Sequence, residues 1–267
     1  MITVEHLKKS YKTTGTMFGS AKQHVLTDVS FHLRHGECLG IVGESGSGKS
    51  TLSRILLGLE RYDGGTILID GMPHNKWVKQ NKGKMSVVFQ DYRTSVNPNW
   101  TIEQIISEPL NMLCQSEGGR KQHAAIIAEL MERIQLPRGY LHKHPHELSG
   151  GQLQRICIAR ALTTRPRYLI LDEAISSLDV SVQSQILTLL KELQAEYSLT
   201  YLFIAHDLQA VTYLCDHLAF LRGGVIIEEL DCNHIHSAQN EYVQQLVGSV
   251  LPFQSAFGGR STERELT

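Results

Sequence analysis

The chain has 267 residues, of which 42% are hydrophobic and 20% charged, and its formal net charge is −1. This length can bury a large core without disulfide or metal cross-links, and the balanced charge argues against a nucleic-acid binder, which normally carries an excess of Lys and Arg. No apolar run approaches the roughly 20 residues that span a bilayer, and Met1 to Ser10 has no signal-peptide core, so we expect a cytosolic polypeptide.

The first part of the chain predicts two strands and a strand–loop–helix unit. Met1 to Leu7 and Val25 to Leu33 have strand-like patterns and flank a polar loop from Thr13 to Lys22. The apolar run Leu39 to Val42 then ends in a glycine-rich turn, and Thr51 to Leu59 has helical spacing.

The middle third of the chain differs from its surroundings. Thr66 to Asp70 and Met85 to Phe89 are further strand candidates. Thr101 to Leu113 and Arg120 to Leu136 then carry apolar residues three to four positions apart, with no strand candidate between them. We interpret roughly residues 91–160 as a helical subdomain.

Strands and helices alternate again towards the C-terminus. Tyr168 to Leu171 and Thr200 to Ala205 are apolar strands, and Ser181 to Tyr197 between them is an amphipathic helix. Leu218 to Leu221 and Val225 to Ile227 form a hairpin about two glycines. The order of elements predicts an α/β core with a helical insertion.

The turn after Leu39 to Val42 has the sequence GESGSGKS (residues 43–50), which fits the phosphate-loop pattern G-x-x-x-x-G-K-[ST] between a strand and a helix. The glycines let backbone N–H groups surround phosphate oxygens, Lys49 adds a positive charge, and the Ser50 hydroxyl can ligate Mg²⁺. The residues expected to contact nucleotide here are Gly43, Ser45, Gly46, Gly48, Lys49, Ser50 and the adjacent Thr51.

Two carboxylates, Asp172 and Glu173, follow the apolar strand Tyr168 to Leu171. We expect Asp172 to hold the Mg²⁺ ion through water, and Glu173 to orient or deprotonate the attacking water. ATP and Mg²⁺ are therefore the expected ligands.

A second glycine-containing helix start is found at Leu148-Ser149-Gly150-Gly151-Gln152, before the helical run Leu153 to Leu162. One nucleotide does not need two such anion sites. The pentapeptide resembles the signature of the ATP-binding cassette (ABC) family, and the resemblance covers about residues 1–230. In that family the signature of one subunit, here Ser149, Gly150, Gly151 and Gln152, closes over the ATP held by the phosphate loop of the other, so the resemblance implies a dimer.

The resemblance also implies a fold and a domain organisation. The fold is α/β, a RecA-like P-loop NTPase with an N-terminal antiparallel β subdomain and the helical insertion. Residues 1–230 would form the ATP-binding domain and residues 231–267 a C-terminal extension, whose tail from Leu251 to Thr267 we expect to be flexible.

Four more residues match functional positions of the family. Tyr11 resembles the aromatic residue that stacks on adenine, and Asp179 the aspartate whose loop crosses to the partner. Gln90 resembles the glutamine that senses metal and water and couples to the membrane subunits, and His206 the histidine that contacts the γ-phosphate. The resemblance thus gives Gln90, Glu173 and His206 as catalytic residues and Ser50, Gln90 and Asp172 as Mg²⁺ ligands, and it predicts a competent hydrolase.

The stretch from Gln90 to Leu110 resembles ATPases of the oligopeptide, dipeptide and nickel uptake group, where "NP", T-[IV] and "EPL" recur. Leu153 beside the signature and Ala174 after Glu173 are similar to the nickel-import branch. The resemblance implies an importer ATPase for nickel or a metal chelate, with dipeptides or oligopeptides as the alternative substrates. It also implies a heterodimer with a paralogous ATPase.

The same resemblance implies a location and partners. The chain would lie on the cytoplasmic face of the inner membrane, bound to two separate permease subunits near the helical insertion and the segment after Gln90. An extracytoplasmic solute-binding protein would act with it indirectly. No nucleic-acid partner is expected.

Two groups of side chains could ligate a metal ion by their chemistry. One is His142, His144 and His146 before the signature, and the other is Cys232, His234 and His236 near the C-terminus. Such spacing occurs more often in solvated loops than in metal sites. The cysteines lack a C-x-x-C pair and are expected to be reduced, mostly buried thiols. They are Cys38, Cys114, Cys157, Cys215 and Cys232.

Three other functions compete with an importer ATPase. A DNA-repair relative would need a long coiled coil between the phosphate loop and the signature, and a translation relative usually has two cassettes. An inactive regulatory subunit is disfavoured by the intact Glu173 and His206. An exporter subunit is disfavoured by the stretch at 91–110.

Overall fold

The computed structural model describes residues 1–13, 21–113 and 119–250. In chain order the strands and α-helices are β1 (Ile2–Thr13), β2 (Ala21–Leu33), β3 (Cys38–Val42), α1 (Lys49–Leu56), β4 (Gly64–Ile69), β5 (Met72–Pro73), α2 (His74–Gln80), β6 (Met85–Phe89), α3 (Ile102–Leu113), α4 (Gly119–Arg133), α5 (Gly150–Leu162), β7 (Tyr168–Asp172), α6 (Val180–Tyr197), β8 (Thr200–Ala205), α7 (Leu208–Leu214), β9 (His217–Arg222), β10 (Val225–Asp231) and α8 (Glu241–Val250). Short 3₁₀ helices lie at Arg138–His142, Pro145–Glu147 and Cys232–Ser237.

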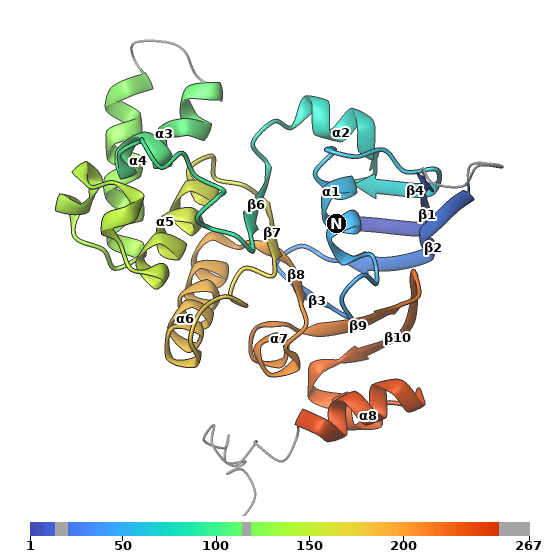
Figure 1. The fold of residues 1–267 in the computed structure, drawn as a ribbon. Coiled ribbons are helices and arrows are strands. Elements are labelled where there is room, and N and C mark those ends of the chain that lie inside the picture. The colour runs from blue at the N-terminus through green and yellow to red at the C-terminus, as the bar shows by residue number, and fades with distance from the viewer. Residues whose placement is uncertain (14–20, 114–118, 251–267) are drawn as a thin grey trace, which may run out of the picture.

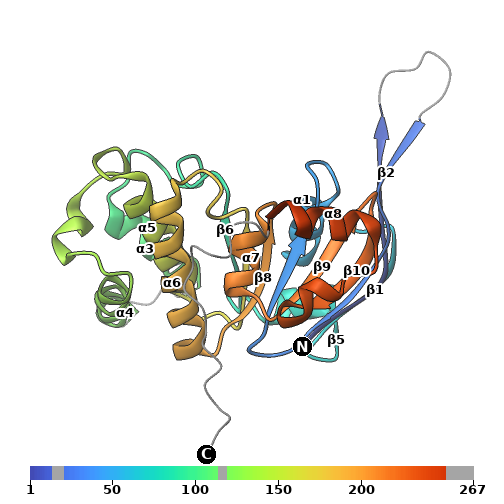
Figure 2. The ribbon, with the colours of Figure 1, turned by 90° about the horizontal axis from the view of Figure 1, so that it is seen from below.

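The strands of the described residues form a mixed sheet in the order β5-β4-β1-β2-β10-β9-β3-β8-β7-β6. β9, β3, β8, β7 and β6 pair in parallel, whereas β1 pairs antiparallel with both β2 and β4. β10 joins the two parts, because it pairs antiparallel with β9 and meets β2 at Val225 and Asp28. Figures 1 and 2 show the antiparallel strands at one side of the molecule and the helices α3 to α5 at the other.

The central parallel strands are buried on both faces, which explains their continuous apolar sequences. In β3, Leu39 and Ile41 belong to a core with β1, β2 and α1, whereas Cys38 and Val42 belong to a second core with helices α3 to α7. The predicted α/β fold with a helical insertion is confirmed at this level.

Several elements differ from those predicted from the sequence. β1 and β2 are longer than expected because they pair along their length as a ribbon, with register irregularities that interrupt the side-chain alternation. The elements β5, α2, α7 and α8 were not predicted, since each is short and depends on tertiary contacts. α7, for example, has seven residues and starts where the Asp207 carboxylate accepts a hydrogen bond from the Gln209 amide at 2.8 Å.

The cysteines are placed as expected where the structure describes them. Cys38, Cys157 and Cys215 are buried thiols, and Cys232 is partly exposed. Cys114 and the tail from Leu251 to Thr267 lie outside the described residues.

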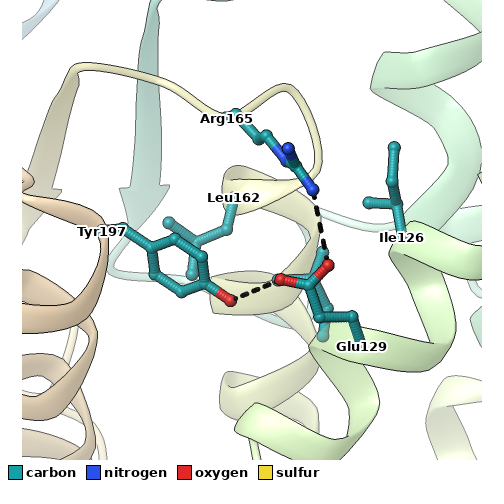
Figure 3. Close-up of a pocket in the computed structure, with 6 residues that line it drawn as sticks. Ile126, Glu129, Leu162, Arg165 and Tyr197 are labelled. Atoms are coloured by element: carbon teal, nitrogen blue, oxygen red, sulfur yellow. Dashed lines mark hydrogen bonds and ion pairs between the residues drawn. The ribbon is translucent and has the colours of Figure 1, made fainter.

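Helices α3 to α5 form a helical group, and Glu129 of α4 joins this group to α6 by a hydrogen bond (Figure 3). Its carboxylate accepts hydrogen bonds from the Tyr197 hydroxyl of α6 at 3.0 Å and from Arg165, in the turn after α5, at 3.5 Å. The cavity beneath these groups is lined by Ile126 and Leu162 and has a volume of about 10 Å³. This is space for about one water molecule, so the cavity is not a ligand site.

A second polar cluster, around Asp70, lies where β1 begins. One carboxylate oxygen of Asp70 accepts hydrogen bonds from the Tyr168 hydroxyl at 2.6 Å and the Met1 amino group at 2.8 Å. The other accepts from Arg167 at 2.8 Å and the Trp77 indole at 3.2 Å. Although burial opposes ionisation, hydrogen bonds from Met1 and Tyr168 hold the pKa of Asp70 well below its usual range.

Asp70→Asn is expected to lower the free energy of unfolding by about 2 kcal/mol at pH 7, because the amide loses the charge-assisted bonds that join four segments of the chain. The measurement is urea unfolding of both proteins. Because the folded-state pKa of Asp70 is depressed, its stabilisation is present above the unfolded-state pKa of about 3.9 and is lost as the pH falls through the folded-state value. The difference between the two proteins should therefore be constant from pH 7 to 5 and shrink below about pH 4; equal stabilities at pH 7 would contradict the assignment.

Candidate functional site

The glycines of the turn between β3 and α1 are required by its backbone. Gly46 and Gly48 have φ angles of 80° and 109°, which L side chains rarely adopt. A Cβ on Gly43 would lie 2.2 Å from the Leu221 carbonyl oxygen. Residues 44–46, at the tip of the turn, are exposed, and the turn leads directly into the amino-terminal end of α1.

Lys49 lies under this turn and is 4% exposed. Its ammonium group donates hydrogen bonds to the carbonyl oxygens of Gly43 and Glu44, both at 2.8 Å. Burial lowers the pKa of Lys49, and the nearby carboxylates of Glu173 and Asp172 oppose that shift. The turn thus holds a positive charge beside a helix start, which is the arrangement that attracts a phosphate.

The hydroxyls of the turn add polar groups to the same place. Ser47, which the sequence analysis did not name as a nucleotide contact, has a buried Oγ without a hydrogen-bond partner in the described part of the chain. Ser50 is exposed in the first turn of α1, and Thr51 is buried. A buried hydroxyl without a partner is costly, and an anionic ligand would satisfy it.

Asp172 and Glu173 stand at the end of β7. Asp172 is 7% exposed, and burial raises its pKa. A buried carboxylate of this kind is stabilised in its ionised form by a cation, so Asp172 and the exposed Ser50 hydroxyl fit a hard divalent ion such as Mg²⁺.

Glu173 has a left-handed backbone, with φ of 50°, which is uncommon outside glycine. Its amide donates to the Ile204 carbonyl oxygen at 2.8 Å, which fixes this conformation against β8. The Glu173 carboxylate is then 3.8 Å from Nδ1 of His206, and the His206 side chain is 58% exposed. A strained residue held in this way at a polar edge is typical of functional sites.

Strand register brings four predicted segments to one edge of the sheet. Phe89 of β6 pairs with Asp172 of β7, and Asp172 pairs with Ile204 of β8. Val42 of β3 pairs with Ala205 of β8. The residues that follow these strands, which are Gly43, Gln90, Glu173 and His206, therefore emerge at the same carboxyl edge, where ligands bind in parallel α/β sheets.

The signature residues lie elsewhere, at the start of α5. The Ser149 hydroxyl accepts a hydrogen bond from the Gln152 amide at 3.3 Å, and the Gln152 side chain accepts from the Ser149 amide at 2.9 Å. This reciprocal pair caps the helix. Figures 1 and 2 both separate α5 from α1, so a single chain does not bring the signature to the phosphate loop.

Two other predicted residues, Asp179 and Tyr11, have side-chain partners in the structure. Asp179 is exposed and caps α6, because its carboxylate accepts from the Val182 amide at 3.0 Å and the Ser181 hydroxyl at 2.7 Å. These bonds hold the pKa of Asp179 below its usual range. The hydroxyl of Tyr11, on β1, lies 3.4 Å from the Thr51 hydroxyl, so its ring stands beside the start of α1.

The histidine groups do not form a metal site in the described ranges. Across residues 1–13, 21–113 and 119–250, no group of three or more His, Cys, Asp or Glu side chains is arranged to hold a metal ion. His144 and His146 stack on each other with ring centroids 5.7 Å apart. Over the same described ranges, no helix has the length and apolarity that crossing a membrane requires.

The chain is similar to a family model, to several known proteins and to solved structures. The family model described as "ABC transporter" matches residues 26–176. The chain is 41% identical to the metal-staphylopine import system ATP-binding protein CntF of Staphylococcus aureus, over 95% of this chain and 100% of that protein. It is 39% identical to the nickel import ATP-binding protein NikE of Rhodospirillum rubrum, over 96% of this chain and 93% of that protein. The dimeric post-hydrolysis structure of the ATP-binding cassette MJ0796, bound to ADP and Pi, superposes with a TM-score of 0.76 at 26% identity, covering 87% of this chain and 99% of the other.

Proposed function

The chain belongs to the ABC transporter family of ATP-binding proteins, and from this premise we propose that it is the ATP-hydrolysing subunit of an importer for nickel or a metal chelate. The observation that carries the proposal is the meeting of the phosphate loop, Gln90, Glu173 and His206 at one edge of the sheet. We take residues 1–230 as the ATP-binding domain, with the helical subdomain at about 91–160, and residues 231–267 as an extension.

In this proposal the phosphate loop binds the triphosphate of ATP. Lys49 neutralises charge on the β- and γ-phosphates and the backbone N–H groups of the loop donate hydrogen bonds to them. Ser45 and Ser47 lie in the same turn, and Thr51 lies in the first turn of α1. Tyr11 stacks on the adenine. Support comes from the burial of Lys49 and from the unpartnered Ser47 hydroxyl.

Ser50, Gln90 and Asp172 would hold the Mg²⁺ ion of MgATP. When bound, the ion supplies positive charge against the phosphate oxygens. Glu173, fixed by its hydrogen bond to Ile204, orients and deprotonates the attacking water, and His206 contacts the γ-phosphate.

The second half of the site would come from another subunit. Ser149, Gly150, Gly151 and Gln152 lie at a capped helix start that faces no phosphate loop of its own chain. A head-to-tail dimer brings each signature to the partner's ATP and lets Asp179 approach the partner. We propose a paralogous ATPase as the partner, as in the uptake group that residues 90–110 resemble.

The dimer would work on the cytoplasmic face of the membrane. We propose two separate permease subunits, bound near the helical subdomain and the segment after Gln90, and a solute-binding protein on the far side. ATP binding closes the dimer and hydrolysis reopens it, and this cycle moves the permeases.

Nickel or a metal chelate is the proposed substrate. The CntF and NikE proteins are named for metal-staphylopine and nickel import, and each spans nearly the whole chain. A dipeptide or oligopeptide is the second candidate, because the stretch at 90–110 resembles that group as a whole.

The test is uptake of radiolabelled Ni²⁺, with and without a chelator, beside a labelled dipeptide. Cells lacking the gene are compared with cells that carry wild type or Lys49→Ala. We expect Ni²⁺ uptake to fall to background in the deletion strain and to return with wild type alone. Unchanged Ni²⁺ uptake with lost dipeptide uptake would overturn the metal assignment and support the second candidate, and no change in either would overturn the importer proposal.

A further inference from the structure

Tyr92, two residues after Gln90, packs against the first glycine of the signature. The Tyr92 side chain is 7% exposed. A Cβ placed on Gly150 would lie 2.6 Å from the Tyr92 hydroxyl oxygen, 3.4 Å from its Cζ and 3.5 Å from Leu178. The Tyr92 hydroxyl therefore occupies the space that any side chain at Gly150 would need.

The segment that carries Tyr92 is attached to α5 at two further points. The Cys157 thiol contacts the Tyr92 carbonyl oxygen at 3.7 Å. Arg160 donates to the Ser95 carbonyl oxygen at 2.6 Å. Residues 92–95 thus follow α5 from its first turn to its last, and a shift of this segment without α5 would break each of these contacts.

The position of the second signature glycine is also closely packed. A Cβ on Gly151 would lie 2.6 Å from Cγ1 of Val182, in the first turn of α6 after Asp179. The amino-terminal end of α5 is therefore packed against both Tyr92 and Val182. Because protein interiors are close-packed, a displacement of Tyr92 is passed to α5 and is not absorbed by a gap.

We propose that Tyr92 is a positioning residue, which transmits the position of the segment after Gln90 to the start of α5 and so sets where Ser149 and Gly150 meet the partner's nucleotide. The inference rests on the proposed dimeric ATPase. In this proposal Gly150 and Gly151 serve two purposes. They allow close approach to a phosphate of the partner's nucleotide, and they leave room for Tyr92 and Val182 of their own subunit.

The packing step is tested by second-site rescue in the full-length protein. Gly150→Ala is expected to lower the Tm by about 5 °C, because the new Cβ collides with the Tyr92 hydroxyl. Tyr92→Phe removes only that oxygen and leaves Cζ at an ordinary contact distance, so the double variant is expected to regain the wild-type Tm. A double variant as unstable as Gly150→Ala, or a Gly150→Ala variant with the wild-type Tm, would overturn the inference.

The positioning step is tested by ATP-driven association in the Glu173→Gln background. The chain is measured alone and with the separately purified paralogous ATPase subunit. Tyr92→Leu keeps an apolar side chain but loses the contact with Gly150, and we expect its association to weaken about 10-fold, with ATP affinity of the separate subunit unchanged. Tyr92→Phe, which loses only the hydroxyl, should weaken association less than Tyr92→Leu does. Ile127→Ala on α4, also buried, is the control that lowers Tm without changing association of the folded protein.

The two proposals fail in different ways. If the Glu173→Gln parent does not associate with saturating ATP, the dimeric ATPase and this inference are both overturned. If the parent associates and Tyr92→Leu associates equally well, the inference alone is overturned and the proposed function stands.

Discussion

Replacing Glu173 by Gln is expected to slow ATP hydrolysis by about 10²- to 10⁴-fold, the usual contribution of a positioned general base. The amide keeps the size and hydrogen-bonding reach of the carboxylate but cannot accept the proton of the attacking water. ATP affinity should stay within about twofold of wild type. In the proposed mechanism Glu173 acts on the attacking water during hydrolysis and does not hold ATP in the ground state.

The measurement is phosphate release under single-turnover conditions, at protein concentrations where the subunits associate. Glu196→Gln, which changes a surface carboxylate paired with Arg133, is the matched control and should retain full activity. A Glu173→Gln protein with more than a tenth of wild-type turnover would remove Glu173 from the proposed mechanism.

Lys49→Ala is expected to weaken ATP binding by about 100-fold, or about 2.7 kcal/mol, and to abolish turnover. The substitution removes the buried positive charge under the phosphate loop and leaves the carbonyl oxygens of Gly43 and Glu44 without their donor. Equilibrium titration with a fluorescent ATP analogue measures the loss.

The control variant for this position is Lys49→Arg. It keeps the charge, but the planar guanidinium does not reproduce a compact ammonium that bonds two carbonyl oxygens, so we expect binding between that of wild type and Lys49→Ala. Wild-type affinity in a folded Lys49→Ala protein would exclude the phosphate loop as the triphosphate site.

The local parts of the site could be predicted from the sequence because the backbone itself encodes them. The glycines of the phosphate loop occupy conformations or close contacts that other residues cannot adopt, as Gly43 and Gly48 illustrate. Ser149 and Gln152 form a cap through bonds only three residues apart. Such short-range requirements leave a pattern that can be read without knowing the fold.

Contacts between distant segments could not be predicted in this way. That Gln90 stands beside Glu173 follows from the pairing of β6 with β7, and strand order has no local signal. The contact of Tyr92 with Gly150 depends on how the helical group packs, and no pattern at Tyr92 indicated it. The roles of the individual site residues remain predictions until variants are measured.

Helix α8, the last helix of the described residues, is another element that the sequence did not predict. Val243 and Val247, four residues apart, are buried at 0% and 4% exposure, so α8 has one apolar stripe. Tyr242 and Leu246 pack partly buried against the same core, but a ten-residue segment is too short for its apolar pattern to distinguish a helix from a loop. Packing against the fold, not propensity, stabilises such a helix.

The central claim is that the ATP site is completed by a second subunit, and sedimentation velocity of the Glu173→Gln protein tests it most directly. The protein is run alone and with the separately purified paralogous ATPase subunit, with and without saturating MgATP, beside a Glu173→Gln/Ser149→Arg variant that carries a bulky cation at the signature. We predict a two-subunit species only with MgATP, and its loss in the Ser149→Arg variant despite unchanged ATP binding by the single chain. A protein that stays a single subunit with its partner and saturating MgATP present would contradict the account.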